Sequence, residues 1–264
     1  MAVGEGEKES LLTRFDNWFW YDNHALFENQ AHLMATYCHG EEGPNGIARA
    51  VRMLCLVALV GEGLLFLYIL HFNLLAFLAI ALIFMTVWGY LFTLATFILG
   101  VRLMGKPAPE DGAESTRKCC KGWKWWIFLY QTSLSLEIII TIVYWVLLYP
   151  LIKNTEFLNK NRLVQWHLAL IHTVPIGCLV VDYFINAVPI APRHLSGILA
   201  IAVLYLIDNI IVVKLSGKPV YVILKWNDWA SIILSAILFA FSIALFYILF
   251  FINKAKLRYF AKNR

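Results

Sequence analysis

The chain has 264 residues, of which 61% are hydrophobic and 15% charged, and its formal net charge is +5. Soluble domains are nearer half apolar and a quarter charged, so this composition excludes an ordinary soluble domain. With 10 Trp, 12 Tyr and 18 Phe, it predicts an all-α polytopic membrane protein. A β-barrel is excluded because short segments of alternating polarity are absent.

The first fifty residues differ from the remainder of the chain. They begin with the acidic stretch MAVGEGEKES and have no apolar core of a signal peptide, so they are not a targeting sequence. The following stretch DNWFWYDNHALF is rich in aromatic residues. We therefore expect residues 1–50 to form an interfacial or soluble segment that contacts protein partners or the lipid surface.

Six apolar runs follow, each long enough to cross a bilayer, which takes roughly 20 residues. They cover residues 51–71, 75–101, 126–152, 163–188, 196–216 and 228–253. We predict a six-transmembrane helix bundle in a single membrane domain, 51–253, followed by a basic tail at 254–264. The first two helices are separated only by the stretch HFN, which predicts a tight hairpin.

The distribution of basic residues predicts the orientation. With six spans, both termini lie on one side of the membrane, and that side carries sixteen of the 22 Lys and Arg residues, against six on the other. The positive-inside rule places this side in the cytosol, or in the matrix if the membrane is mitochondrial. Its charge favours contact with anionic lipid. Nothing in the sequence resembles a nucleic-acid-binding module, so we expect no nucleic acid partner.

The cysteines do not predict a disulfide framework or a zinc site, because there are five of them, irregularly spaced and without a CxxC pair. We expect no metal and no cofactor. Cys119 and Cys120 lie beside the third span in RKCCKGWKWW, a setting compatible with palmitoylation, and the alternative is two free thiols.

The polar residues within the apolar runs are the candidate functional groups, because burying charge in a bilayer costs a few kcal/mol or more. At about 1.5 Å per residue, five of them fall near the membrane midplane, each on a different helix. They are Glu62, Thr86, Glu137, His172 and Asp208. We expect one polar layer inside the bundle, and each residue has a structural alternative: paired carboxylates, a buried histidine, or a threonine bonded to its own backbone.

The fourth run contains more polar residues than the others. Pro175 should bend the helix just after His172 and make room at that depth. Asp182 lies ten residues beyond His172, about 15 Å away along a helix, which is too far for contact. His172 and Thr86 share their depth, so we predict a hydrogen bond between them, directly or through one water.

Four segments resemble the rolling stone family of membrane proteins: FMTVWGYLFTLATFIL (84–99), TIVYWVLLYP (141–150), HTVPIGCLVVDYFINAVPIAPRH (172–194) and KPVYVILKWND (218–228). The same pattern is similar, more distantly, to the FAR-17a/androgen-induced family. Members of that family are multi-pass hydrolases of branched fatty acid esters of hydroxy fatty acids, and they use an intramembrane threonine and histidine. The resemblance covers residues 50 to 253.

This resemblance implies an intramembrane hydrolase of lipid esters, with Thr86 as nucleophile and His172 as base. Glu137 or Asp208 would orient the histidine, because a catalytic base normally has an orienting partner. The expected partners are the bilayer and a lipid ligand, in the endoplasmic reticulum or plasma membrane, with the mitochondrial inner membrane as the alternative. The rival hypothesis is a non-enzymatic accessory subunit of a larger membrane complex. Transport is weaker, because the sequence shows no inverted repeat and no pair of broken helices.

Overall fold

The structure is a computed structural model that describes residues 44–71, 73–104, 113–186 and 188–262. In these ranges the chain is helical, with one isolated β-bridge between Tyr221 and Leu224 and no strand. The α-helices are α2 (Pro44–Ile69), α3 (Leu74–Ile83), α4 (Met85–Met104), α5 (Ala113–Ile142), α6 (Tyr149–Ile152), α7 (Glu156–Lys160), α8 (Arg162–Ile171), α9 (Val174–Ile185), α10 (Leu195–Ser216) and α11 (Trp229–Lys262). A π-helix, η1 (Val143–Leu148), and a 3₁₀ turn, η2 (Pro192–His194), complete the set.

Six of the helical segments are long and apolar enough to cross a membrane, which confirms the predicted all-α polytopic fold and makes this an integral membrane protein. They are Ala48–Ile69, Met85–Leu103, Lys124–Ile152, Arg162–Ile185, Pro192–Ser216 and Trp229–Tyr259. The expected segment 1–50 lies outside the described residues apart from its last turns, where α2 begins. The side chains of Cys119 and Cys120 also lie outside them, so their acylation stays a prediction.

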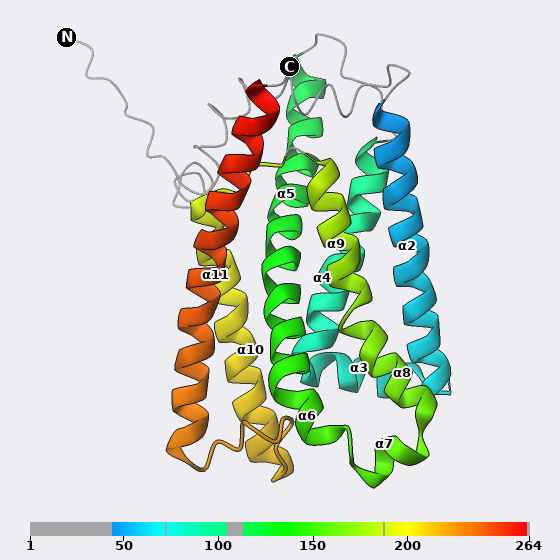
Figure 1. The fold of residues 1–264 in the computed structure, drawn as a ribbon, viewed down its shortest axis with the longest axis vertical. Helices are drawn as coiled ribbons and strands as arrows, with labels where there is room; N and C mark the ends of the chain where they lie inside the picture. Colours follow the sequence, from blue (N-terminus) through cyan, green and yellow to red (C-terminus); the bar gives the residue numbers. More distant parts are fainter. Residues whose placement is uncertain (1–43, 72, 105–112, 187, 263–264) are drawn as a thin grey trace, which may run out of the picture.

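The long helix α5 stands in the middle of the bundle (Figure 1). It packs against α4 and α9 on one side and against α10 and α11 on the other, and α2 completes the first group by packing on α4 and α9. The hydrophobic core lies mainly among α2, α4, α5 and α9, with buried residues such as Leu59, Tyr130 and Leu179. Large apolar side chains cover the outside, for example Leu54 and Leu215, as expected for a surface that faces lipid tails.

The second predicted span is not one helix. The backbone is extended at Phe84, with φ −106° and ψ 123°, so α3 ends there and α4 begins as a separate helix. Only Met85–Leu103 has the length of a span. The sequence gives no warning of this break, because neither Gly nor Pro occurs between residues 74 and 88. The break moves Thr86 from the expected midplane to the first turn of α4.

The fourth span is interrupted where the sequence predicted a bend. Helix α8 ends at Ile171, and α9 begins at Val174 with Pro175 in its first turn, so His172 and Thr173 form the junction. Proline is well tolerated at this position, because the first N–H groups of a helix have no intrahelical partner. The second and fourth spans are thus both interrupted, which corrects the expectation that the chain has no pair of broken helices.

Two helices continue beyond the predicted spans. Helix α5 begins at Ala113, in the stretch between the second and third predicted spans, and α11 continues to Lys262 through most of the predicted tail (254–264). The apolar criterion detects only the part of a helix that crosses the bilayer. This criterion therefore did not detect the polar turns at the start of α5 and at the end of α11.

Candidate functional site

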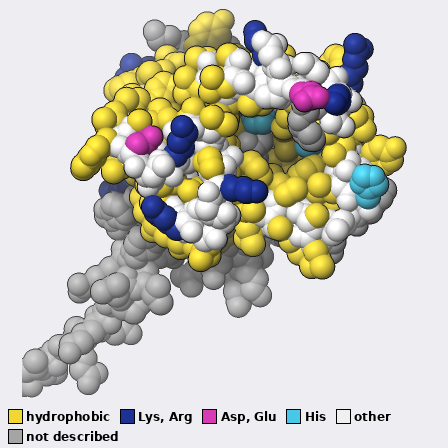
Figure 2. Space-filling model, turned by 90° about the horizontal axis from the view of Figure 1, so that it is seen from below, with side chains coloured by type: hydrophobic (Ala, Val, Ile, Leu, Met, Phe, Trp, Pro, Cys, Tyr) yellow, Lys and Arg dark blue, Asp and Glu magenta, His cyan; other side chains and the backbone are white. Residues whose placement is uncertain are grey.

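A cavity of about 140 Å³ lies between α4, α5, α10 and α11, at the end of the bundle that the loop 217–228 closes. Its wall is largely apolar, with Leu136, Ile140 and Phe239 among the lining residues. The polar lining residues are Thr86, His172, Tyr205, Tyr221, Ser235 and Ser242. Figure 2 looks at this end of the molecule, where Lys and Arg side chains are scattered among hydrophobic ones and histidine side chains are visible in a recess.

Thr86 and His172 meet at the wall of this cavity. The distance from Thr86 Oγ1 to His172 Nε2 is 3.1 Å, which confirms the predicted hydrogen-bond reach. Thr86 is the second residue of α4, and His172 is the first residue after α8. Both side chains are thus carried by the interruptions of the second and fourth spans.

The contact made by the other ring nitrogen of His172 shows which of the two nitrogens carries the hydrogen. Its Nδ1 lies 2.6 Å from the backbone carbonyl oxygen of Leu168. A carbonyl oxygen only accepts, so Nδ1 carries the hydrogen and Nε2 keeps its lone pair. The Thr86 hydroxyl therefore donates to Nε2, which is the arrangement in which a neutral imidazole accepts a proton from a nucleophile. The prediction that Glu137 or Asp208 orients His172 is wrong: the carbonyl oxygen of Leu168 holds the Nδ1 side of the ring.

The imidazole of His172 is also held by packing. The ring of Tyr144 lies flat against it, with centroids 3.6 Å apart and an angle of 10° between the planes. Tyr144 is buried and belongs to the π-helix η1. Thr141, one turn earlier, donates its hydroxyl to the backbone carbonyl of His172 at 3.0 Å. π-Helical turns often occur at functional sites, because the extra residue per turn displaces side chains from the regular helical positions.

Two tyrosines tie the break before α4 to the rest of the bundle. The hydroxyl of Tyr205 donates to the carbonyl of Ile83 at 3.0 Å, and the hydroxyl of Tyr221 accepts from the backbone N–H of Met85 at 3.1 Å. These bonds satisfy polar backbone groups that the interruption of the helix leaves without partners. Tyr221 belongs to the loop 217–228, and burial raises its pKa above the ordinary value of 10, so the phenol stays protonated.

The carboxylates expected in the same polar layer do not line the cavity. Glu62 is buried against α8, with Oε1 2.7 Å from Nδ1 of His167. Glu137 is buried between α5 and α4 and accepts from Thr93 at 3.4 Å. Asp208, on α10, has an oxygen without a hydrogen-bond partner among the described residues. The expected single polar layer around the site is therefore wrong: Glu62 and Glu137 lie against His167 and Thr93 instead of the cavity, because depth along a helix does not fix the direction of a side chain.

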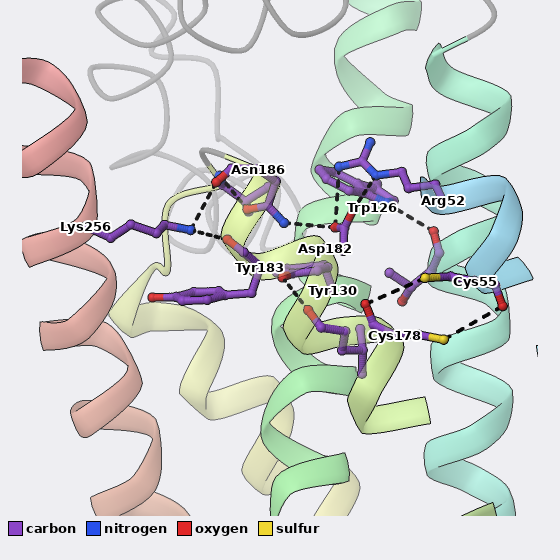
Figure 3. A network of polar contacts seen from close by, with 12 residues as sticks. Arg52, Cys55, Trp126, Tyr130, Cys178, Asp182, Tyr183, Asn186 and Lys256 are labelled. Atoms are coloured by element: carbon purple, nitrogen blue, oxygen red, sulfur yellow. Dashed lines mark hydrogen bonds and ion pairs between the residues drawn. The ribbon is translucent and has the colours of Figure 1, made fainter. Parts of the chain in front are cut away.

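Asp182 belongs to a second polar cluster at the other end of the bundle (Figure 3). Its Oδ1 lies 2.5 Å from Nε of Arg52, and its Oδ2 accepts from Asn186 at 2.9 Å. The Arg52 guanidinium also lies over the ring of Trp126, 4.7 Å from its centroid. Lys256 of α11 donates to the carbonyls of Tyr183, in the last turn of α9, and of Asn186, the residue after that helix. As predicted, Asp182 makes no contact with His172; it joins α2 and α9.

Several residues of the site were missed by sequence analysis. Tyr144 and Tyr221 both lie in segments singled out for their resemblance, TIVYWVLLYP and KPVYVILKWND, but nothing in their spacing assigned them to the cavity. Leu168 takes part through its carbonyl, which no side-chain pattern reports. Among the described residues, no group of three or more His, Cys, Asp or Glu is placed to hold a metal ion. The chemistry available is that of a hydroxyl, a neutral imidazole and a phenol.

No protein-family model, no curated protein and no solved structure matches this chain.

Proposed function

We propose that this protein is an intramembrane threonine hydrolase that cleaves lipid esters, with Thr86 as nucleophile and His172 as general base. One observation carries the proposal: Thr86 Oγ1 lies 3.1 Å from His172 Nε2 at the wall of an apolar cavity, while the Leu168 carbonyl holds the opposite nitrogen. A threonine that merely satisfies its backbone has no need of this partner. The resemblance to the rolling stone and FAR-17a/androgen-induced families supports the same pair of residues.

In the proposed reaction, His172 Nε2 takes the hydroxyl proton as Thr86 Oγ attacks the ester carbonyl carbon. The tetrahedral adduct then expels the alcohol, which leaves with the proton held by the imidazole. A water molecule, deprotonated by the same nitrogen, attacks the acyl-threonine and releases the fatty acid. The neutral imidazole is restored at the end of the cycle, as in other hydroxyl–histidine hydrolases.

The lining of the cavity favours a lipid substrate. Of the side chains that surround Thr86, most are aliphatic or aromatic, and they come from helices whose outer faces contact the bilayer. Such a wall binds an acyl chain by excluding water, and it offers no charge to a polar substrate. Fatty acid esters of hydroxy fatty acids, the substrates implied by the resemblance, fit this description. We place the enzyme in the endoplasmic reticulum or plasma membrane, with the mitochondrial inner membrane as the alternative.

The test uses the purified full chain, an alkyl fluorophosphonate probe and a fatty acid ester of a hydroxy fatty acid as substrate. We expect the probe to label Thr86, Thr86→Val to abolish labelling and hydrolysis, and Thr86→Ser to keep part of both. His172→Gln should lower the rate by about 10²-fold or more, the lower range for loss of a general base. Thr96→Val is the matched control, because Thr96 lies on the same helix but donates to the carbonyl of Phe92.

An unlabelled, inactive wild-type protein would contradict the proposal and favour the rival hypothesis of a non-enzymatic accessory subunit. That hypothesis rests on the aromatic segment DNWFWYDNHALF, which lies outside the described residues. Labelling that persists in Thr86→Val would also contradict the proposed hydrolase function of Thr86, because another nucleophile would then be responsible.

A further inference from the structure

We propose that Tyr221 is a catalytic residue that donates a hydrogen bond to the carbonyl oxygen of the ester as it becomes negatively charged, an inference that rests on the proposed function. Neither Thr86 nor His172 can stabilise that oxygen, because one is the nucleophile and the other faces it as a base. A hydrolase of this type needs at least one preorganised donor beside the nucleophile.

The position of the Tyr221 hydroxyl suits this role. It lines the cavity, it accepts the backbone N–H of Met85 at 3.1 Å, and it lies in contact with Thr86, the next residue. In the tetrahedral adduct the oxyanion and Thr86 Oγ are bonded to the same carbon. A donor within reach of the nucleophilic oxygen therefore also reaches the oxyanion after a small rotation of the phenol.

The environment strengthens the phenol as a donor. Its oxygen accepts from Met85, and a hydroxyl that accepts one hydrogen bond donates a stronger one. Burial keeps the phenol neutral by raising its pKa, so the hydroxyl retains a hydrogen that it can turn from its neighbours Thr86 and Tyr205 to the ester. The site also lies at the N-terminus of α4, a helix of 20 residues, whose dipole favours negative charge there.

The second tyrosine of the cavity wall, Tyr205, does not fit the role. Its hydroxyl already donates to the carbonyl of Ile83 at 3.0 Å and accepts from the side chain of Asn209 at 3.4 Å. Donation to a substrate would leave the Ile83 carbonyl, at the break before α4, without this partner. The two phenols therefore have different roles: Tyr205 stabilises the break before α4, and Tyr221 donates to the ester oxygen. No bond to Tyr221 is made or broken in the cycle.

The experiment measures the rate of fluorophosphonate labelling and the kcat of ester hydrolysis on the full chain. We expect Tyr221→Phe to lower both by about 10²- to 10³-fold, the range found for loss of one oxyanion donor, with little change in KM. The phenylalanine ring keeps the edge-to-face contact with Phe84. Tyr130→Phe is the matched control, since it removes a buried hydroxyl that donates to Leu179 outside the cavity; its rates should equal those of the wild type.

A second variant separates catalysis from support of the fold. Fluorinated tyrosine at position 221 keeps every contact but has a more acidic phenol, so the alkaline limb of the kcat–pH profile should move to lower pH. A structural role would leave that limb in place. Wild-type rates in Tyr221→Phe, or an unmoved limb, would refute the role of Tyr221 while Thr86 labelling stands. A wild-type protein that is neither labelled nor active would refute the role of Tyr221 together with the proposed function.

Discussion

The imidazole of His172 lies flat on the ring of Tyr144, with centroids 3.6 Å apart. The proposed base is therefore held by a stacked aromatic ring as well as by its contacts with Thr86 and Leu168. Tyr144 belongs to the π-helix η1, which directly follows α5, whereas the imidazole belongs to the interruption between α8 and α9. Two local departures from regular α-helix thus meet at one ring. The orientation of the proposed base depends on both.

Removing the aromatic ring of Tyr144 should lower activity without abolishing it. An aromatic pair contributes about 0.5–1.5 kcal/mol beyond its buried area, so we expect Tyr144→Leu to reduce the labelling rate of Thr86 about threefold to tenfold. Tyr144→Phe keeps the stacked ring and should behave like the wild type. Leu147→Ala, an exposed position of the same π-helix, is the control. Equal rates for Tyr144→Leu and Tyr144→Phe would show that stacking does not position the imidazole.

The two glycines of α2 that flank Glu62 should respond in opposite ways to alanine. A Cβ on Gly63 would collide with the hydroxyl of Tyr90, whose hydrogen bond to the Leu59 carbonyl is 2.8 Å long, whereas a Cβ on Gly61 meets nothing within 4 Å. We expect Gly63→Ala to destabilise the protein by about 1–3 kcal/mol, the usual cost of overpacking. Gly61→Ala should stabilise it by up to about 1 kcal/mol, the difference in helix propensity.

Thermal unfolding in detergent, followed by circular dichroism, distinguishes these outcomes. A lower midpoint for Gly63→Ala and an equal or higher one for Gly61→Ala are expected. If both variants shift in the same direction, the close approach of α2 and α4 at Gly63 is not what limits the packing there.

The buried pair of Arg52 and Asp182 should be more important for stability than for catalysis. Their side chains are only 7% and 2% exposed, and removing one partner of such a pair costs about 3–5 kcal/mol because the other charge stays buried. We therefore expect Asp182→Asn to lower the unfolding midpoint strongly. The double variant Arg52→Leu with Asp182→Leu should recover most of the loss, because it removes both charges of the buried pair together.

The same variants test the separation of the two clusters. Since Asp182 contacts neither Thr86 nor His172, the labelling rate per folded molecule should remain unchanged in the double variant. A stable double variant that no longer labels would contradict this, and would place Asp182 in the catalytic machinery.

The start of α11 should be sensitive to acid. Asp228 accepts the backbone N–H of Ser231 at 3.0 Å and its hydroxyl at 2.8 Å, and these bonds hold the pKa of Asp228 below the ordinary 3.8. A carboxyl with a lowered pKa stabilises the fold above its unfolded pKa, and this contribution is lost as the pH falls through the folded value. Wild type should therefore lose stability relative to Asp228→Asn below about pH 4, because the amide still accepts but does not titrate.

Unfolding midpoints of the two proteins, measured side by side from pH 7 to pH 3, give the comparison. Other carboxyl groups titrate in both proteins and cancel in the difference. Parallel curves over the whole range would mean that the carboxylate of Asp228 does not support the start of α11.

The sequence by itself determined the class of protein and most of its helices, because apolar length is a one-dimensional property. A run of about 20 apolar residues crosses a bilayer whatever its neighbours are. The pairing of Thr86 with His172 was also predicted from the sequence, although the break at Phe84 places Thr86 in the first turn of α4 and not at the expected midplane. The break beside Pro175 was predictable because proline cannot continue the hydrogen bonds of a helix.

The tertiary structure alone decided the remainder of the site. The break at Phe84 has no signal in the chain, since the bonds that compensate it come from Tyr205 and Tyr221, more than 100 residues away. The sequence predicts Glu62, Glu137 and Asp208 in one layer, but none of them lines the cavity, because the direction of a side chain around its helix is set by packing against neighbours. The orienting partner of His172 is a backbone carbonyl, which every residue possesses and which only the junction between α8 and α9 makes available.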